Sequence, residues 1–142
     1  PPVCTYEGMD SLLNLRYRIM GDDNKAYVSP VGAVWNYIRD NHPDIDLYSS
    51  DGSHPSLAGS YAAACTFYSI LFQKNPTLVS FNSSLSESDA NTIKEAAKII
   101  AFDNLSEWNV GTFDPVADFS FTQNGTEITF NNNSTFSEGF FL

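Results

Sequence analysis

The chain has 142 residues, with 17 acidic and 7 basic side chains, a formal net charge of -10 and a pI near 4.3. Seven basic residues cannot form a phosphate-binding stripe among so many acids, which argues against nucleic acid and anionic membranes as partners. Hydrophobic residues make up 42% of the chain, enough for one ordinary core, and no apolar run approaches the roughly 18 residues of a membrane-spanning helix.

The two ends of the sequence predict a piece of a longer protein. It begins with Pro1-Pro2 instead of methionine and ends on the apolar stretch Gly139–Leu142. The partner of Cys4, if it has one, is expected upstream of the first residue. Cys65 lies within an apolar helical stripe, so we expect a buried, reduced thiol that does not pair with Cys4.

The first half of the chain alternates between helical and strand-like patterns. Apolar residues at helical spacing predict a first helix that stops at Gly21, with Arg16 and Arg18 on its solvent side. Ser29-Pro30 is typical of an N-cap followed by proline at the first helical position. The expected elements are helix 9–20, strand 25–28, helix 31–38, strand 45–48 and a helix from Leu57 to Phe72.

This order of elements is typical of a parallel sheet flanked by helices, so the fold class expected here is α/β. In such sheets, functional residues gather in the loops at the carboxyl ends of the strands. Asp51 and His54 fall in a loop of this kind, between strand 45–48 and the helix that follows.

Beyond Pro76 a further helical stripe runs to Trp108, and the pattern then changes. After Gly111, alternating apolar residues surround Asn124-Gly125, which predicts a β-hairpin. We expect two domains, 1–113 and 114–142, with the second holding only the first strands of a β-sandwich.

The spacing of Asp51 and His54 has a chemical and a structural interpretation. A histidine acting as a base needs a carboxylate that fixes its tautomer and stabilises its cation, and Gly52 lets the turn bring the two side chains together. Alternatively, Asp51-Gly52 is an ordinary turn before a helix. We expect the two side chains to be hydrogen-bonded at the edge of the parallel sheet.

The segment from Asp51 to Tyr61, DGSHPSLAGSY, resembles the last conserved block of the SGNH, or GDSL-type, hydrolases, and Ser29–Trp35 looks like the segment before it in secreted bacterial members. The resemblance covers roughly residues 1–110 and implies part of a flavodoxin-like fold. It makes His54 the general base of a serine esterase and Asp51 its orienting acid.

Three parts of that family's machinery are absent from this sequence: the nucleophilic serine of an N-terminal Gly-Asp-Ser block, and the glycine and asparagine of the oxyanion hole. The lookalike Gly21–Asn24 follows a helix and has Asp23 where serine is needed. Ser53 and Ser56 lie near His54 but are expected to make local hydrogen bonds or a helix cap. The nucleophile is therefore expected in the upstream half of the same domain.

Residues 117–135 look like the first strands of a PKD-type domain, an extracellular immunoglobulin-like sandwich. The leading function is thus the C-terminal part of a secreted esterase acting on small-molecule or polysaccharide esters, inactive as the isolated chain. The alternative is a non-catalytic extracellular binding or spacer module. His42, at a helix end, could join Asp51 and His54 as a metal ligand, but no ligand-spaced motif supports this and a surface role is expected. No cofactor or metal is expected.

Overall fold

The computed structural model describes residues 5–135 and divides the chain into two compact units, residues 1–110 and 111–142. The sequence predicted a boundary after residue 113. Cys4 and Gly139–Leu142 lie outside the described residues, so the expectations for them stay predictions.

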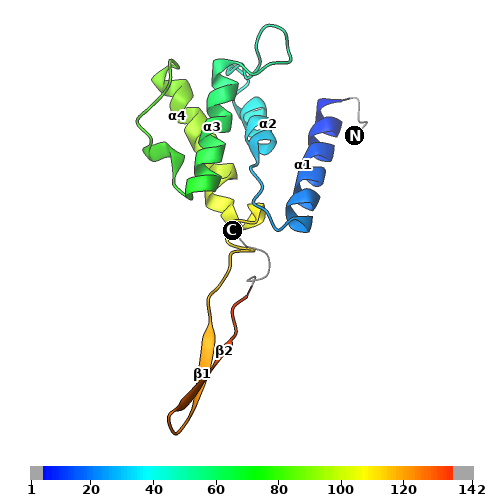
Figure 1. The fold of residues 1–142 in the computed structure, drawn as a ribbon. Coiled ribbons are helices and arrows are strands. Elements are labelled where there is room, and N and C mark those ends of the chain that lie inside the picture. The colour runs from blue at the N-terminus through cyan, green and yellow to red at the C-terminus, as the bar shows by residue number, and fades with distance from the viewer. Residues whose placement is uncertain (1–4, 136–142) are drawn as a thin grey trace. The chain divides into compact units, whose positions relative to one another are not determined.

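The first unit is built from helices (Figure 1). Helices α2, α3 and α4 pack against one another, and α1 lies beside α2. The elements are α1 (Tyr6–Asp23), α2 (Val31–Asn41), α3 (Leu57–Phe72), the 3-10 helix η1 (Pro76–Leu78), α4 (Glu87–Ile100) and the 3-10 helix η2 (Phe102–Trp108).

The expected parallel sheet flanked by helices is wrong. The described residues are 53% helical, and their only sheet is a two-stranded antiparallel one in the second unit. Neither predicted strand of the first unit, 25–28 or 45–48, is a strand; apart from one isolated antiparallel bridge between Tyr48 and Pro55, both are loop. The backbone N–H and C=O groups of a strand need a neighbouring strand as hydrogen-bond partner. In this unit the helices α2 and α3 contact each other directly instead of covering a sheet.

Residues 44–48 show why the sequence pattern misled. Ile45 and Leu47 are buried while Asp44 and Asp46 are exposed, so the alternation of burial is the expected one. The two apolar side chains enter the core between helices, not one face of a sheet. Period-two alternation thus records which side chains are buried but does not show that the backbone is paired.

The helices begin where side chains can cap them. Ser56 Oγ accepts a hydrogen bond from Gly59 N at 3.1 Å, and Ser86 Oγ accepts one from Asp89 N at 3.0 Å. The predicted cap at Ser29 is wrong, because α2 begins at Val31 and Pro30 occupies the N-cap position without a side-chain bond.

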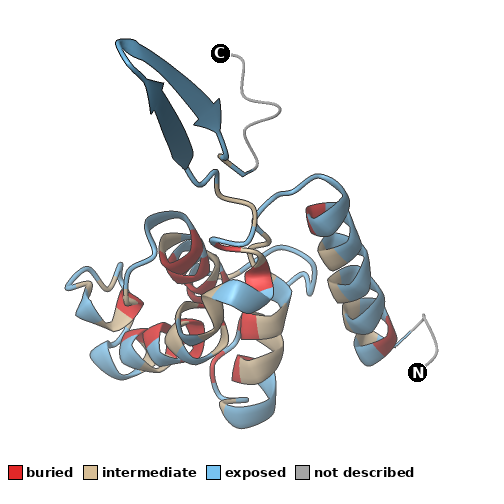
Figure 2. Cartoon of the chain, turned by 90° about the horizontal axis from the view of Figure 1, so that it is seen from below, coloured by how far each residue is buried: buried red, intermediate tan, exposed pale blue. Residues whose placement is uncertain are grey.

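The main core lies among α2, α3 and α4, where the buried residues of the first unit concentrate (Figure 2). Small side chains on α4 let it approach α3 closely. Cys65 is a free, buried thiol in this core, as expected. The core residues are Val34, Ile38, Ile45, Leu47, Ala58, Tyr61, Ala62, Cys65, Ala90, Ile93, Ala96 and Ala97.

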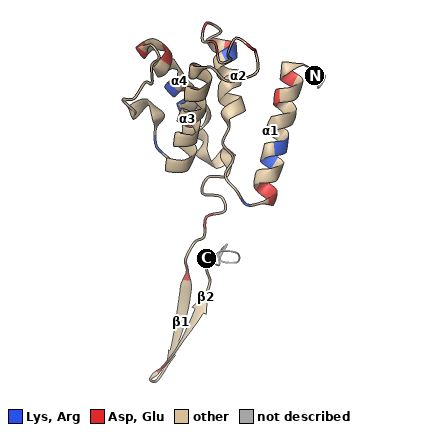
Figure 3. Cartoon of the chain, turned by 45° about the horizontal axis from the view of Figure 1, so that its top comes forward, with Lys and Arg blue, Asp and Glu red and all other residues tan. Residues whose placement is uncertain are grey.

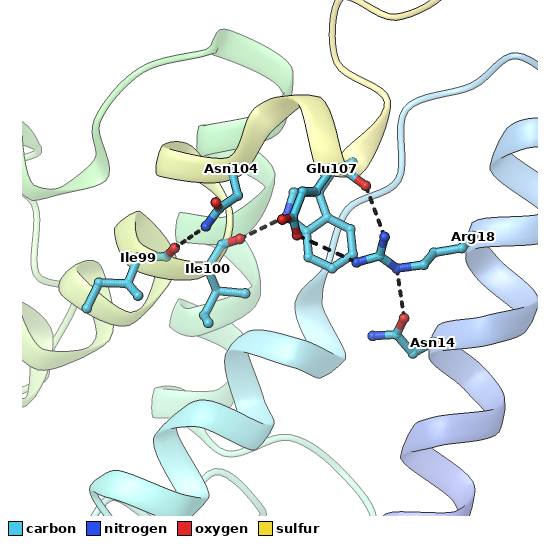
Figure 4. Close-up of polar contacts among 7 residues, drawn as sticks. Asn14, Arg18, Ile99, Ile100, Asn104 and Glu107 are labelled. Atoms are coloured by element: carbon cyan, nitrogen blue, oxygen red, sulfur yellow. Dashed lines mark hydrogen bonds and ion pairs between the residues drawn. The ribbon is translucent and has the colours of Figure 1, made fainter.

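Helix α1 contributes little to that core, since only Gly8 and Gly21 of its 18 residues are buried. Arg18 connects it to the end of the unit (Figure 4). Its guanidinium lies 4.2 Å from the ring centroid of Trp108 and donates to the carbonyl of Glu107 at 3.3 Å. The Arg18 side chain is still 41% exposed, in keeping with its expected solvent-side position, and its guanidinium also gains from the negative face of the indole ring.

The second unit is a hairpin of β1 (Phe119–Asn124) and β2 (Glu127–Asn132). The strands are antiparallel with Asn124 opposite Glu127, so Gly125 and Thr126 form the turn, and Gly125 adopts a φ of 64°. The hairpin expected from the Asn124-Gly125 signal is confirmed.

Gly59 lets α3 approach Leu47 and Trp35 closely, and its substitution tests that packing. A Cβ at this position would clash with the Leu47 carbonyl and lie 2.7 Å from Cζ2 of Trp35. We expect Gly59→Ala to lower the free energy of unfolding by about 1–3 kcal/mol in urea titrations. Gly32→Ala, whose Cβ would meet only ordinary contacts, is the matched control and should stabilise by up to about 1 kcal/mol. Equal effects of the two variants would contradict the close packing.

The chemistry of Cys65 gives a second test of the core. Burial raises the pKa of its thiol, which leaves little thiolate to react. Peptide mapping after iodoacetamide treatment should find Cys65 unmodified in native protein and fully modified in guanidinium chloride. Modification at equal rates in both conditions would show that α3 is not packed as described.

Candidate functional site

The turn between residue 48 and α3 carries the predicted acid and base. It is closed at its base by the hydrogen bond from Ser49 N to the His54 carbonyl at 2.8 Å, next to the Tyr48 to Pro55 bridge. Gly52 reverses the chain with a φ of 68°, a conformation that glycine adopts without strain. The two functional side chains therefore leave the same tight turn.

Asp51 accepts three hydrogen bonds within this turn. Its Oδ1 accepts from the backbone N–H groups of Ser53 at 2.9 Å and His54 at 3.0 Å. Its Oδ2 lies 2.6 Å from Nδ1 of the His54 ring. The hydrogen bond expected from the sequence is therefore present, although the parallel sheet edge on which it was expected is not.

These bonds hold the pKa of Asp51 below its ordinary value, with the Ser53 N–H as the largest cause and the His54 ring next. An ionised carboxylate can only accept, so Nδ1 must carry the proton that it donates. In a neutral imidazole, Nε2 is then the unprotonated nitrogen. None of the hydrogen bonds among residues 5–135 engages Nε2, so it is open to an incoming hydroxyl or water.

The helix that follows fixes the turn in place. Ser56 caps α3 and also donates from Oγ to the Asp46 carbonyl at 2.7 Å, while its N–H donates to the Leu47 carbonyl at 2.9 Å. Ser49 Oγ donates to the Pro55 carbonyl at 3.0 Å. Ser56 is thus engaged as a cap, as expected, and is not available as a nucleophile.

The hydrogen-bonded pair of Asp51 and His54, called the dyad from here on, is open to solvent. The side chain of His54 is 79% exposed and that of Asp51 is 51% exposed. No hydrogen bond joins His54 to a serine hydroxyl within the described part of the chain. The geometry provides an oriented base to which no hydroxyl among residues 5–135 is hydrogen-bonded.

A separate apolar groove of about 830 Å³ lies between α1 and the segments opposite it. Its lining comes from α1, the segment that joins α1 to α2, the first turn of α2, α3 and Trp108 at the end of η2. Its apolar lining includes Leu13, Tyr17, Met20, Val28, Phe67 and Trp108. Asp51 and His54 are not among its lining residues, so the groove is a second feature and not part of the dyad.

Helix α3 carries an apolar stripe of Leu57, Tyr61, Cys65, Tyr68 and Phe72. The two ends of this stripe lie outside the core, because Leu57 is 49% and Phe72 63% exposed. The helix is apolar on all sides and carries no charged residue (Figure 3). An apolar helix with an uncovered face is typical of a surface that packs against further protein.

Trp35 and His42 lie outside the turn of Asp51 and His54 and have structural roles. The Trp35 ring packs edge-on against Tyr48, with the ring centroids 4.9 Å apart, next to the core. His42 ends α2 as its C-cap and lies beside Tyr37. Among residues 5–135, no group of three His, Cys, Asp or Glu side chains is placed to hold a metal ion.

Reasoning from the sequence missed the polar network around Lys94. This buried ammonium donates to the Val79 carbonyl at 2.8 Å and to Asn82 Oδ1 at 2.6 Å, which holds the loop before α4. Nothing in the sequence marks Lys94 as different from other helical lysines. The signal appears only when burial and carbonyl partners are known.

Comparisons with known proteins assign no family to this chain: no protein-family model, no curated protein and no solved structure matches it. No helix in the described part of the chain has the length and hydrophobicity needed to cross a bilayer.

The carboxyl of Asp51 reports whether the dyad forms in solution. His54→Ala removes one donor but keeps the backbone N–H groups, so the pKa of Asp51 should rise only part of the way to its ordinary value. Because the folded-state pKa lies below the unfolded one, these bonds stabilise the turn above pH ~4 and are lost as the pH falls through the folded value.

A ¹³C NMR titration of the side-chain carboxyl measures this shift. His42→Ala, which removes the chain's other histidine, should leave the Asp51 titration unchanged. An Asp51 pKa that is the same in His54→Ala and wild-type protein would mean that the two side chains do not bond in solution.

Proposed function

We propose that this chain supplies the histidine and acid of a serine esterase of the SGNH type. The observation that carries the proposal is the 2.6 Å contact between Asp51 Oδ2 and His54 Nδ1, which leaves Nε2 free. In a Ser-His-Asp system the acid orients the imidazole through Nδ1, and Nε2 takes the proton of the serine hydroxyl. The flanking sequence from Asp51 to Tyr61 supports the same reading.

The reaction needs two parts that the described residues do not provide. A serine hydroxyl must attack the ester carbonyl while Nε2 accepts its proton, and oxyanion donors must stabilise the resulting tetrahedral intermediate. We assign both to an upstream half of the same domain. Substrates would be small-molecule or polysaccharide esters, in an extracellular setting, with no cofactor.

Uncovered apolar surface supports a missing half. Helix α1 exposes Leu12, Leu15 and Ile19 by 36–53%, and α3 exposes Phe67 and Leu71 by 47% and 65%. Burying apolar area contributes roughly 25 cal/mol per Å², so protein that covered these side chains would gain considerable stability. Of these side chains, Phe67 also lines the apolar groove.

The second candidate is a non-catalytic extracellular binding or spacer module. The exposure of His54 favours it, since catalytic histidines work in sites that exclude water. Under this alternative, the Asp51 to His54 bond only stabilises the turn before α3. The two candidates differ in one outcome, ester hydrolysis that depends on His54.

Ester hydrolysis by protein from the natural gene, including residues that precede Pro1, tests the proposal. It should hydrolyse 4-nitrophenyl acetate, and His54→Ala should lower kcat/KM on the order of 10³-fold or more, because the serine loses its base. Asp51→Asn should also impair the enzyme through a misoriented imidazole. Residues 1–142 alone should be nearly inert.

Two controls accompany this assay. Ser53→Ala lies in the same turn but donates only its backbone N–H to Asp51, so it should retain activity. His42→Ala should do the same. An active isolated chain, or a longer protein indifferent to His54→Ala, would refute the proposed function and favour the binding module.

A further inference from the structure

The apolar groove beside α1 is bounded by cationic contacts at both ends of that helix. At the start of α1, the Arg39 guanidinium lies 3.3 Å from the centroid of the Tyr6 ring. Toward the end of α1, Arg18 lies over Trp108 in the same way. These contacts attach the helix to the rest of the first unit without filling the space along its middle, which is the groove of about 830 Å³.

The two walls of the groove are apolar helix faces. Leu13, Tyr17 and Met20 are four and three residues apart, so they lie along one side of α1. The opposite wall includes Ala63 and Phe67, which are four residues apart on α3. Small-molecule sites have volumes of roughly 300–1,000 Å³ and mostly apolar walls with a few polar groups, so this groove has the size and lining of such a site.

Oxygen-bearing side chains lie at one end of the groove, where α1 meets the first turn of α2. Asp10 Oδ1 would lie 3.5 Å from a Cβ added at Gly32, and Ser29 comes just before that turn. Ser29 Oγ is buried and has no hydrogen-bond partner among residues 5–135. A buried hydroxyl without a partner costs free energy, and a polar ligand atom at this end would remove that cost. From Asp10 to Met20 the helix rises about 15 Å, so a long apolar wall follows the polar end.

The charge at the polar end discriminates between ligands. Asp10 is the only charged side chain among the described residues that line the groove, and the whole chain has a formal net charge of -10. A carboxylate or phosphate head placed there is therefore repelled. Burial raises the pKa of Asp10 while the nearby Arg39 guanidinium lowers it, so the carboxylate already has a cation close by. An uncharged hydroxyl can donate to Asp10 and accept from Ser29 Oγ.

We propose that this groove binds a long-chain lipid whose head is uncharged. The head lies at Asp10 and Ser29, and the chain packs along Tyr17 and Met20. Apolar cavities that water fills poorly bind apolar molecules, and the polar end fixes the direction in which the chain enters. Neither member of the dyad lines the groove, so this binding does not depend on ester hydrolysis.

Protein that precedes Pro1 is the competing occupant. The surface that an upstream half would cover includes Leu12, Leu15 and Ile19, none of which lines the groove. By helical spacing, these three side chains lie on another side of α1 than Leu13. Covering them therefore leaves the groove open to a ligand.

Displacement of Nile red, an uncharged dye that fluoresces in apolar sites, tests the proposal on residues 1–142. We expect 1-dodecanol to displace the dye at a concentration about tenfold or more below that needed for dodecanoate. Ala63→Trp, which places an indole in the groove, should weaken 1-dodecanol binding by about tenfold or more. Ala64→Trp, at the neighbouring exposed position outside the lining, is the matched control and should leave binding unchanged. Equal binding by the two variants would overturn the proposal.

A second pair of variants tests the polar end and needs no change in the shape of the groove. Asp10→Asn removes the repelling carboxylate, so dodecanoate should then bind within about threefold of 1-dodecanol. Asp23→Asn changes the net charge of the chain equally but lies outside the lining, so the preference for 1-dodecanol should persist. A preference that is the same in Asp10→Asn and wild-type protein would contradict the placement of the head.

Protein from the natural gene, including residues that precede Pro1, separates the lipid from the competing occupant. It should bind 1-dodecanol with the affinity of residues 1–142, and His54→Ala should bind it equally well. Loss of 1-dodecanol binding in the longer protein would overturn the proposal in favour of upstream protein in the groove. Binding that persists without ester hydrolysis would refute the proposed function alone.

Discussion

The direct contact between α3 and the chain at Leu47 is the constraint on which the site depends. Because Gly59 has no side chain, the first turn of α3 can approach the Leu47 carbonyl and the Trp35 ring. That approach brings Ser56 within reach of the Asp46 and Leu47 carbonyls. The turn that carries the acid and base is consequently held at both ends by the same packing.

Within that frame, the dyad is a local structure. Its hydrogen bonds join residues two and three positions apart, so Asp51 can orient His54 without help from distant parts of the chain. A local arrangement of this kind forms without contacts from distant segments, so the imidazole is oriented although no serine hydroxyl among residues 5–135 is hydrogen-bonded to it.

The uncovered apolar surfaces have a shared physical meaning. Helix α1 buries only two glycines, and the hairpin buries none of its large apolar side chains. Exposed apolar patches on soluble proteins usually mark surfaces that pack against other protein. Each unit of this chain carries one such surface, the helix faces of α1 and α3 in the first and the Phe119 to Phe130 face in the second.

Local signals in the sequence determined the helices, the hairpin and the dyad, because caps, glycine turns and periodicity act over a few residues. Ser56, Ser86 and Gly125 mark their elements directly, and the Asp51 to His54 spacing predicts their hydrogen bond. Tertiary structure alone decided the fold class. The alternation at Ile45 and Leu47 reports burial equally well in a sheet or between helices, and only the direct packing of α2 on α3 distinguishes the two. The same holds for Arg18 and Lys94, whose partners come from distant segments that no local pattern identifies.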